Sequence, residues 1–272
     1  MSQSPRWIDS DPDFPPELNS KVAHPARVWD YWLGGKDNFA ADRAAGDQLS
    51  AAIPDWIPIV RADREFLARV VSHAVTSAGI SHFLDIGTGV PTANNTHEVA
   101  QRLDPAARVV YVDNDPIVLV HARALLTSTE QGATDYVDAD LRDPERILNA
   151  AARTLDLGQP VLVTLLGIME FIPDDAEARS IVERLLGDLA PGSLLAMTHP
   201  LTGTVMDQAM RLWNDSGATP VTVRSQSAVR ELFAGVDLLD PGLVSLPQWR
   251  PTPQTAHTDR DLPFYCAVGR KP

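Results

Sequence analysis

From residue 82 onward, short runs of apolar residues alternate with longer stretches in which apolar side chains recur every three or four positions. The short runs are typical of parallel strands buried on both faces, and the longer stretches are typical of amphipathic helices. The alternation predicts an α/β fold, with a doubly wound, mostly parallel sheet of about seven strands and helices on both faces. The predicted strands are His82 to Ile86, Arg108 to Asp113, Thr134 to Asp138, Pro160 to Leu166, Ser193 to His199, either Val221 to Val223 or Leu238 to Leu239, Leu243 to Leu246, and Phe264 to Gly269.

Helical patterns fall between most of these strands. Asn95 can cap a helix to which Glu98 reaches back from the first turn. From Pro241 onward there is no clear helix between the apolar runs, which predicts an antiparallel hairpin at the edge of the sheet. The clearest helical stretches are Pro58 to Ala78, Pro116 to Thr127, Pro144 to Leu155 and Asp174 to Leu189.

The chain divides into three predicted parts. Residues 1–20 are rich in Pro, Ser and Asp and are expected to form a loose tail. Residues 21–80 form a helical extension, in which the pattern from Pro25 to about Gln48 is broken at Gly34 and Gly35. Residues 81–272 form the α/β core.

Composition limits the classes of partner. The formal net charge is −13 and no run of five to eight Lys and Arg residues occurs, so a general nucleic-acid binder is not expected. Cys266 is the only cysteine, which rules out an internal disulfide and a cysteine cluster for zinc, and no metal site is expected. The sequence has neither a signal-peptide pattern nor a membrane-length apolar run, and we expect a cytoplasmic protein with no membrane partner. The oligomeric state is left open.

The run FLDIGTGVP, residues 83–91, reads as a buried strand that ends at a glycine-rich turn. Ligands of open α/β sheets bind outside the carboxyl ends of the strands, and Gly87 and Gly89 let a ligand approach the main chain there. Thr88 lies between them, and Asp85 is placed to face an ammonium group or to cap the loop. No third glycine follows in register, which favours S-adenosylmethionine over a dinucleotide.

The next strand ends in VVYVDND, residues 109–115. A carboxylate at this point can accept both hydroxyls of a ribose, so Asp113 is the first candidate and Asp115 the second. Because the segment also resembles a helix start, one of these aspartates is expected to be a cap. Asn114 is expected beside the adenine.

Together these motifs resemble those of class I, Rossmann-like S-adenosylmethionine-dependent methyltransferases. The segment HPARVWDYWLGGKDNFAADR, residues 24–43, is similar to the N-terminal signature of a bacterial family of such proteins with mostly unassigned substrates. The resemblance implies that the first glycine turn lines the methionine moiety. It also implies that Asp140 accepts the adenine amino group and that the amide of Leu141 meets the ring. An ordinary turn carboxylate is the alternative for Asp140.

The resemblance favours a lid formed by the N-terminal signature, with Tyr31, Gly34, Asn38 and Arg61 touching the cofactor. The alternative is a helical pair that simply packs on the edge of the sheet. Gly167 ends the fourth predicted strand and is expected near the reactive methyl group.

Two residues are candidates for catalysis. Glu170 could orient a substrate amine or hydroxyl, or be an ordinary solvated carboxylate. His199, expected in a turn, is the histidine best placed to act as a general base, although a lone loop histidine is often incidental.

The predicted function is transfer of a methyl group from S-adenosylmethionine to a small-molecule oxygen or nitrogen nucleophile by in-line displacement, which needs orientation and a dry pocket more than a strong base. A protein acceptor is a further possibility. Two alternatives are a non-catalytic S-adenosylmethionine-binding scaffold and a nicotinamide-dependent oxidoreductase.

Overall fold

The computed structural model describes residues 20–91, 94–115, 117–118, 120 and 127–272. The described strands form one eight-stranded sheet with the order β3-β2-β1-β4-β5-β8-β6, and β7 pairs with β8. Strands β1 to β5 are parallel, and β8 runs antiparallel to β5, β6 and β7. The strands are β1 His82–Ile86, β2 Arg108–Asp113, β3 Ala133–Asp138, β4 Val161–Leu165, β5 Leu194–Pro200, β6 Asp237–Leu238, β7 Val244–Ser245 and β8 Phe264–Arg270.

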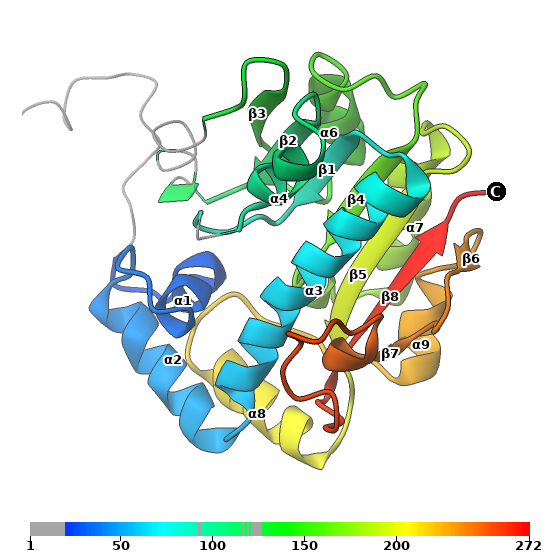
Figure 1. The fold of residues 1–272 in the computed structure, drawn as a ribbon. Helices are drawn as coiled ribbons and strands as arrows, with labels where there is room; N and C mark the ends of the chain where they lie inside the picture. Colours follow the sequence, from blue (N-terminus) through cyan, green and yellow to red (C-terminus); the bar gives the residue numbers. More distant parts are fainter. Residues whose placement is uncertain (1–19, 92–93, 116, 119, 121–126) are drawn as a thin grey trace, which may run out of the picture.

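Alternate side chains of the central strands enter two separate cores. Phe83 of β1 joins the core under α3 (Trp56–Ala78) and α4 (Thr96–Leu103). Its neighbour Leu84 joins the core under α6 (Pro144–Ala151), α7 (Asp175–Gly187) and α9 (Gln226–Glu231). The sheet is therefore covered on both faces, with α3 crossing in front of it in Figure 1.

A third group of helices extends from one end of the sheet. It consists of α1 (Pro25–Trp32), α2 (Ala40–Ala52) and α8 (Thr204–Asp215), which lie together at the lower left of Figure 1. Trp32 joins this group to the rest of the fold, because its ring lies 5.2 Å from that of Trp56 in α3 and 6.4 Å from that of Trp213 in α8. These helices are positioned by a buried aromatic cluster.

The predicted α/β class, the mostly parallel sheet and the antiparallel C-terminal edge are confirmed. Residues 221–223 form no strand, and Asp237–Leu238 takes that place in the sheet. The capping box of α4 is present, with the Asn95 amide donating to Glu98 Oε2 at 2.9 Å. The C-terminal hairpin carries a 3₁₀ turn, Leu246–Gln248, and another such turn, Met169–Phe171, follows β4.

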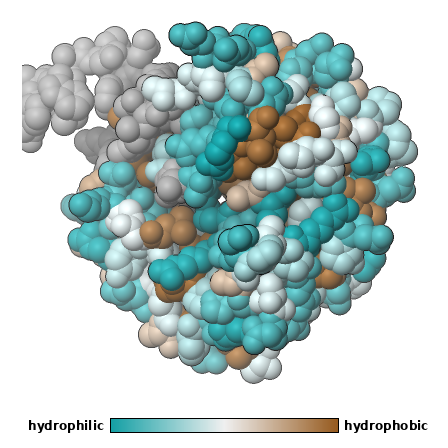
Figure 2. All heavy atoms as spheres, viewed as in Figure 1, coloured by the Kyte–Doolittle hydropathy of each residue, from teal (hydrophilic) through white to brown (hydrophobic). Residues whose placement is uncertain are grey.

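Several predictions fall outside the described residues. These are the tail of residues 1–19 and most of the helix expected at Pro116 to Thr127. Within the described part, no helix is long and apolar enough to cross a membrane. The face in Figure 2 is largely hydrophilic, with small separate hydrophobic patches.

Candidate functional site

A cavity of about 180 Å³ lies at the carboxyl edge of the parallel strands, between the loops that follow β1 to β4 and helix α1. The topology explains its position, because parallel strands end at the same edge and the loops there diverge to leave a crevice. Most of the residues proposed from the sequence for cofactor binding line it: Asp85, Gly87, Thr88, Gly89, Asp113, Asn114, Asp140, Leu141 and Gly167.

The turn after β1 needs its glycines for two reasons. Gly87 and Gly89 both have positive φ, at 76° and 64°, a region that other residues rarely adopt. A Cβ on Gly87 would lie 2.8 Å from the Ile168 side chain, so this position is also closed by packing. Beside Gly89 the nearest described atom would be Ala26 Cβ at 4.0 Å, which leaves the main chain open toward the cavity.

Asp113 holds this turn against the end of β2. Its Oδ2 accepts the Gly89 amide at 2.8 Å, and its Oδ1 accepts the Asp115 amide at 2.9 Å. Burial raises the pKa of the Asp113 carboxyl, and the two backbone hydrogen bonds lower it. The side chain still lines the cavity, so it can accept hydrogen bonds from a ligand with its remaining lone pairs.

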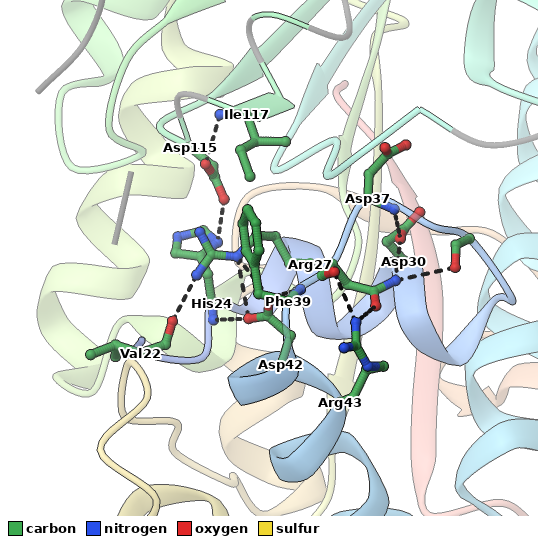
Figure 3. Close-up of polar contacts among 12 residues, drawn as sticks. Val22, His24, Arg27, Asp30, Asp37, Phe39, Asp42, Arg43, Asp115 and Ile117 are labelled. Atoms are coloured by element: carbon green, nitrogen blue, oxygen red, sulfur yellow. Dashed lines mark hydrogen bonds and ion pairs between the residues drawn. The ribbon is translucent and has the colours of Figure 1, made fainter. Parts of the chain in front are cut away.

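Asp115 has a different position from Asp113. Its Oδ1 accepts the Ile117 amide at 2.9 Å, and its Oδ2 lies 2.7 Å from His24 Nδ1 (Figure 3). Burial acts to raise the pKa of Asp115, but the hydrogen bond and charge of His24 bring it below its ordinary value. Asp115 does not line the cavity, and it is the aspartate of the pair that caps.

Both carboxylate oxygens of Asp85 accept hydrogen bonds from side chains of neighbouring elements. Its Oδ2 accepts from Thr96 Oγ1 at 2.5 Å and its Oδ1 from Thr164 Oγ1 at 2.7 Å. Burial raises the pKa of this carboxyl. Asp85 thus joins β1 to β4 and to the start of α4, while it also contributes to the cavity wall.

At the far end of the cavity, beyond β3, lie Asp140 and Leu141. Asp140 Oδ1 accepts the Arg142 amide at 2.8 Å, which is a turn interaction, and its side chain also faces the cavity. Leu141 is buried and provides an apolar wall beside it. A carboxylate next to an apolar surface matches the chemistry of a purine ring with an exocyclic amino group.

Helix α1 forms the opposite wall, and the residues of the N-terminal signature hold it in place (Figure 3). Asp42, at the start of α2, is completely buried and accepts the His24 amide at 2.9 Å and the Phe39 amide at 2.7 Å. Arg27 Nε donates to Asp42 Oδ2 at 3.1 Å, and the Arg27 guanidinium lies over the Phe39 ring. One carboxylate therefore joins the starts of α1 and α2.

Asp30 organises the turn between these two helices. Its Oδ2 accepts the Asp37 amide at 2.9 Å and Asn38 Nδ2 at 2.8 Å. A Cβ on Gly35 would lie 1.8 Å from Asp30 Oδ1, so the second glycine of the signature is required by packing.

The structure places the four residues proposed for the lid elsewhere than expected. Tyr31 donates to Asp47 Oδ1 at 2.6 Å on α2, and Asn38 is held by Asp30. Gly34 and Arg61 are exposed, and none of Tyr31, Gly34, Asn38 and Arg61 lines the cavity. The residues of α1 and α3 that do line it are His24, Pro25, Ala26, Trp29, Asp30, Leu33, Asp63, Arg64 and Leu67.

His199 was expected in a turn, and the structure places it elsewhere. It lies within β5, is completely buried, and does not line the cavity. Arg224 Nη1 donates to His199 Nε2 at 2.8 Å, and His199 Nδ1 donates to the Pro200 carbonyl at 2.8 Å. Burial lowers the pKa of His199 to about 4, which fits an imidazole that stays neutral and accepts from a guanidinium. The geometry does not support a general-base role.

Glu170 lies in the 3₁₀ turn after β4 and is 5% exposed. It is not the solvated carboxylate that was one alternative, since burial raises its pKa to about 8. Glu170 Oε2 has no hydrogen-bond partner within the described part of the chain. Glu170 lies behind the cavity wall rather than in it.

Asp63 and Arg64 of α3 were not predicted. Asp63 lies between Val60 and Leu67 on the apolar face of an amphipathic helix, where a charged residue is costly without a partner. A charged residue at an apolar position of the helix was therefore the feature of the sequence that could have identified Asp63. Arg64 follows it and donates to the Asn94 carbonyl at 3.2 Å.

This sheet topology, with a crevice at the carboxyl edge and an antiparallel last strand, matches the Rossmann-like fold of methyltransferases. Residues 12–272 match the model of a family described as S-adenosyl methyltransferase, and the chain belongs to that family. S-adenosylmethionine is the cofactor. The hypothesis of a nicotinamide-dependent oxidoreductase is therefore set aside.

Two solved structures are closely similar. A DUF574 family protein from Streptomyces avermitilis is 42% identical, with a TM-score of 0.90, and the match covers 94% of this chain and 100% of that one. A protein from Thermobifida fusca described as a candidate methyltransferase is 38% identical, with a TM-score of 0.86 over 94% of this chain and 98% of that one. No curated protein matches the chain. Among the described residues, no group of His, Cys, Asp and Glu is arranged to hold a metal ion.

Proposed function

We propose that the protein transfers the methyl group of S-adenosylmethionine to a nitrogen or oxygen atom of a small molecule, and that the cavity beneath α1 holds both reactants. The observation that supports this proposal is that three groups line the same cavity: the turn after β1, Asp113 at the end of β2 and Asp140 beyond β3. The turn offers an open glycine backbone, Asp113 a carboxylate for ribose hydroxyls, and Asp140 a carboxylate for an adenine amino group. The set fits the cofactor.

Each residue has a proposed contact. Asp113 would accept the ribose hydroxyls, with Asn114 alongside. Asp140 and the Leu141 amide would bind the adenine. The backbone at Gly87 and Gly89 would lie against the methionine moiety. The Arg64 guanidinium would pair with the carboxylate of that moiety. The bound cofactor supplies a methyl group activated by its attachment to a sulfonium sulfur.

The protein's own contribution is orientation and exclusion of water. Methyl transfer needs the nucleophile, the carbon and the leaving sulfur in line, so walls that fix the acceptor can supply much of the acceleration. Trp29 of α1, Leu33 directly after this helix and Phe171 after β4 present apolar surface to the cavity. We propose that residues 21–80 act as the cover of the site, with α1 as the contacting part. A cytoplasmic location and a lack of nucleic-acid partners stay predictions.

The test is calorimetric titration of the full chain with S-adenosylmethionine and S-adenosylhomocysteine, with NADH as the control. We expect micromolar binding of the two sulfur nucleosides and none of NADH. A screen of small amines, alcohols and carboxylic acids with a methyl-labelled cofactor then identifies the acceptor class. Tight cofactor binding with no labelled product from small molecules, but labelled protein in a lysate, would contradict the small-molecule assignment.

A further inference from the structure

The cavity has a second polar end, away from the proposed ribose and adenine contacts, where α3 passes the ends of β4 and β5. Asp63 of α3 lines the cavity there and is only 4% exposed. Its Oδ1 has no hydrogen-bond partner among the residues that the structure describes. A buried carboxylate oxygen without a partner is unfavourable, so a site that retains one is suited to a ligand that donates to it.

Gly167 lies next to several of the polar and aromatic groups at this end of the cavity. Its amide donates to Thr198 Oγ1 at 2.9 Å, and the Thr198 side chain hydrogen-bonds to Asp63. A Cβ on Gly167 would lie 3.3 Å from Trp29 Cζ2 and 3.7 Å from Glu170 Oε1. An indole and the Glu170 carboxyl group therefore lie next to this glycine, and Thr198 connects it to Asp63.

Glu170 adds a second carboxyl group to this end, and burial raises its pKa to about 8, so it is largely protonated at neutral pH unless a cation lies beside it. The carbonyls on either side of its turn are fixed by Arg224, which donates to Met169 O at 3.0 Å and to Ile172 O at 2.5 Å. Glu170 Oε2, like Asp63 Oδ1, has no partner in the described residues. The two carboxyl groups influence each other, because the charge of Asp63, after burial, raises the pKa of Glu170.

The strand order separates this end from the proposed cofactor contacts. Along the edge the order is β3, β2, β1, β4 and β5. Asp140, Asp113 and the glycine turn follow β3, β2 and β1, so the cofactor is expected to run from adenine to methionine along these three strands. Gly167 directly follows the end of β4 and Thr198 lies in β5, the next two strands along the edge. A reactant that meets the methyl group from the far side would lie there.

We propose that the acceptor is an amine that enters as its ammonium cation and is held by the Asp63 carboxylate and the Trp29 indole, with the Glu170 carboxyl group behind Gly167 as a second group whose ionised form a cation would favour. This inference rests on the proposed function and narrows its acceptor from oxygen or nitrogen to nitrogen. Carboxylates and aromatic faces both attract ammonium groups, and burial strengthens each attraction.

The proposal also accounts for the proton. When a C–N bond forms and the C–S bond breaks, the electron pair of that bond goes to sulfur, and the nitrogen must have an unshared pair. The ammonium therefore first gives one proton to Asp63. Burial raises the pKa of Asp63 to about 6, and nearby Asp85 raises it further while Arg64 and Arg69 lower it. A carboxyl group with this raised pKa is a better proton acceptor than an ordinary aspartate.

The first experiment measures binding to the full chain saturated with S-adenosylhomocysteine. The probes are two amine and alcohol pairs of matched shape: 2-phenylethylamine with 2-phenylethanol, and hexylamine with hexanol. We expect each amine to bind about tenfold or more tightly than its alcohol, since a charge-assisted contact is involved. The preference should disappear in Asp63→Asn and decrease in Glu170→Gln. Equal binding of amine and alcohol, or binding of neither, would overturn the proposal.

A second measurement distinguishes the acceptor's ammonium from that of the cofactor. S-adenosylhomocysteine carries an α-ammonium group, and 5′-methylthioadenosine lacks the amino-acid portion. We expect Asp63→Asn to leave the affinities for both nucleosides unchanged. Selective weakening of S-adenosylhomocysteine would assign Asp63 to the cofactor and overturn the proposal. Failure of the unaltered protein to bind either nucleoside would instead overturn the proposed function, and this inference with it.

The variants are chosen to preserve shape. Asp63→Asn and Glu170→Gln replace a carboxyl by an amide of the same size, and Asp259→Asn removes a charge from an exposed position as the matched control. Trp29→Leu tests the aromatic wall and should reduce the amine preference without abolishing it. If Asp63→Asn unfolds the chain, Glu170→Gln and Trp29→Leu still test the proposal. An amine preference that is unchanged in both variants would contradict the proposed ammonium site.

Discussion

The carboxylate of Asp113 accepts the amide of Gly89 at 2.8 Å, so the end of β2 fixes the glycine turn that follows β1. The residue proposed to bind the ribose is thus also the residue that shapes the neighbouring backbone. Replacement by Ala would disturb both, and the amide variant is the more informative change.

For Asp113→Asn we expect affinity for S-adenosylhomocysteine to fall by about tenfold to a hundredfold, because a charge-assisted contact to hydroxyls is lost. The Asn side-chain oxygen can still accept one backbone amide, so the thermal midpoint should move by only a few degrees. Calorimetric titration and thermal unfolding measure the two effects. An unchanged affinity would remove Asp113 from the ribose site.

The contact of His24 with Asp115 joins α1 to the core at 2.7 Å. We expect His24→Ala to increase hydrogen exchange in Ala26–Trp32 and to leave the exchange of β4 unchanged. His257→Ala, at an exposed position, is the control. Equal protection of α1 in both variants would show that the aromatic cluster holds the helix without this contact.

The pH dependence of stability is a test for Glu170. Its folded pKa is about 8, above the ordinary value of about 4.3, so between these values the unfolded chain loses the proton first. The free energy of unfolding therefore falls as pH rises and levels off above pH 8, with a slope of at most about 1.4 kcal/mol per pH unit. Urea unfolding from pH 6.5 to 8 should show this fall, and the free energy of unfolding of Glu170→Gln should depend less on pH over the same range.

His199 acts in a different window and with the opposite sign. Its folded pKa is about 4, below the ordinary value of about 6.5, so the unfolded chain takes up a proton first as pH falls. Its contribution to stability is present above pH 6.5 and is lost between pH 6.5 and 4.

The two groups can therefore be separated by pH. Above pH 6.5, an identical slope of unfolding free energy against pH in Glu170→Gln and in the unaltered chain would contradict the burial of an unpartnered Glu170.

Gly35 and Gly187 form a matched pair. A Cβ on Gly35 would lie 1.8 Å from Asp30 Oδ1, whereas one on Gly187, the last residue of α7, would meet nothing within 4 Å. We expect Gly35→Ala to lower stability by about 1–3 kcal/mol through overpacking and Gly187→Ala to raise it by up to about 1 kcal/mol. Denaturant unfolding measures both. A neutral Gly35→Ala would mean that the turn rearranges at little cost.

The sheet was predictable because its strands are buried on both faces, and such strands are continuous apolar runs with clear ends. The strand ends then located residues that line the cavity, since Asp85, Gly89 and Asp113 need only their position at the ends of β1 and β2 to face it. The local sequence predicted that one of Asp113 and Asp115 is a cap, but it did not predict which one.

The contacts of the N-terminal helices could not be derived in this way. Which face of α1 turns inward depends on Trp32 packing against Trp56 and Trp213, and the last of these is 181 positions away in the chain. The contacts of Tyr31 with Asp47 and of Asn38 with Asp30 could therefore not be predicted, and a contact of either residue with the cofactor stays a prediction. The burial of His199 could not be predicted from the local sequence either, because Arg224, which donates to its ring, lies 25 positions away in the chain.

Asp42 has a consequence for how ligands reach and leave the pocket. The starts of α1 and α2 share this one buried carboxylate, and α2 lies against α8 in the same helical group. Helix α1 therefore cannot swing outward alone without exposing an ion pair. If product leaves through this side, we expect α1, α2 and α8 to move together, so substitutions at the distant Trp213 should change the release rate.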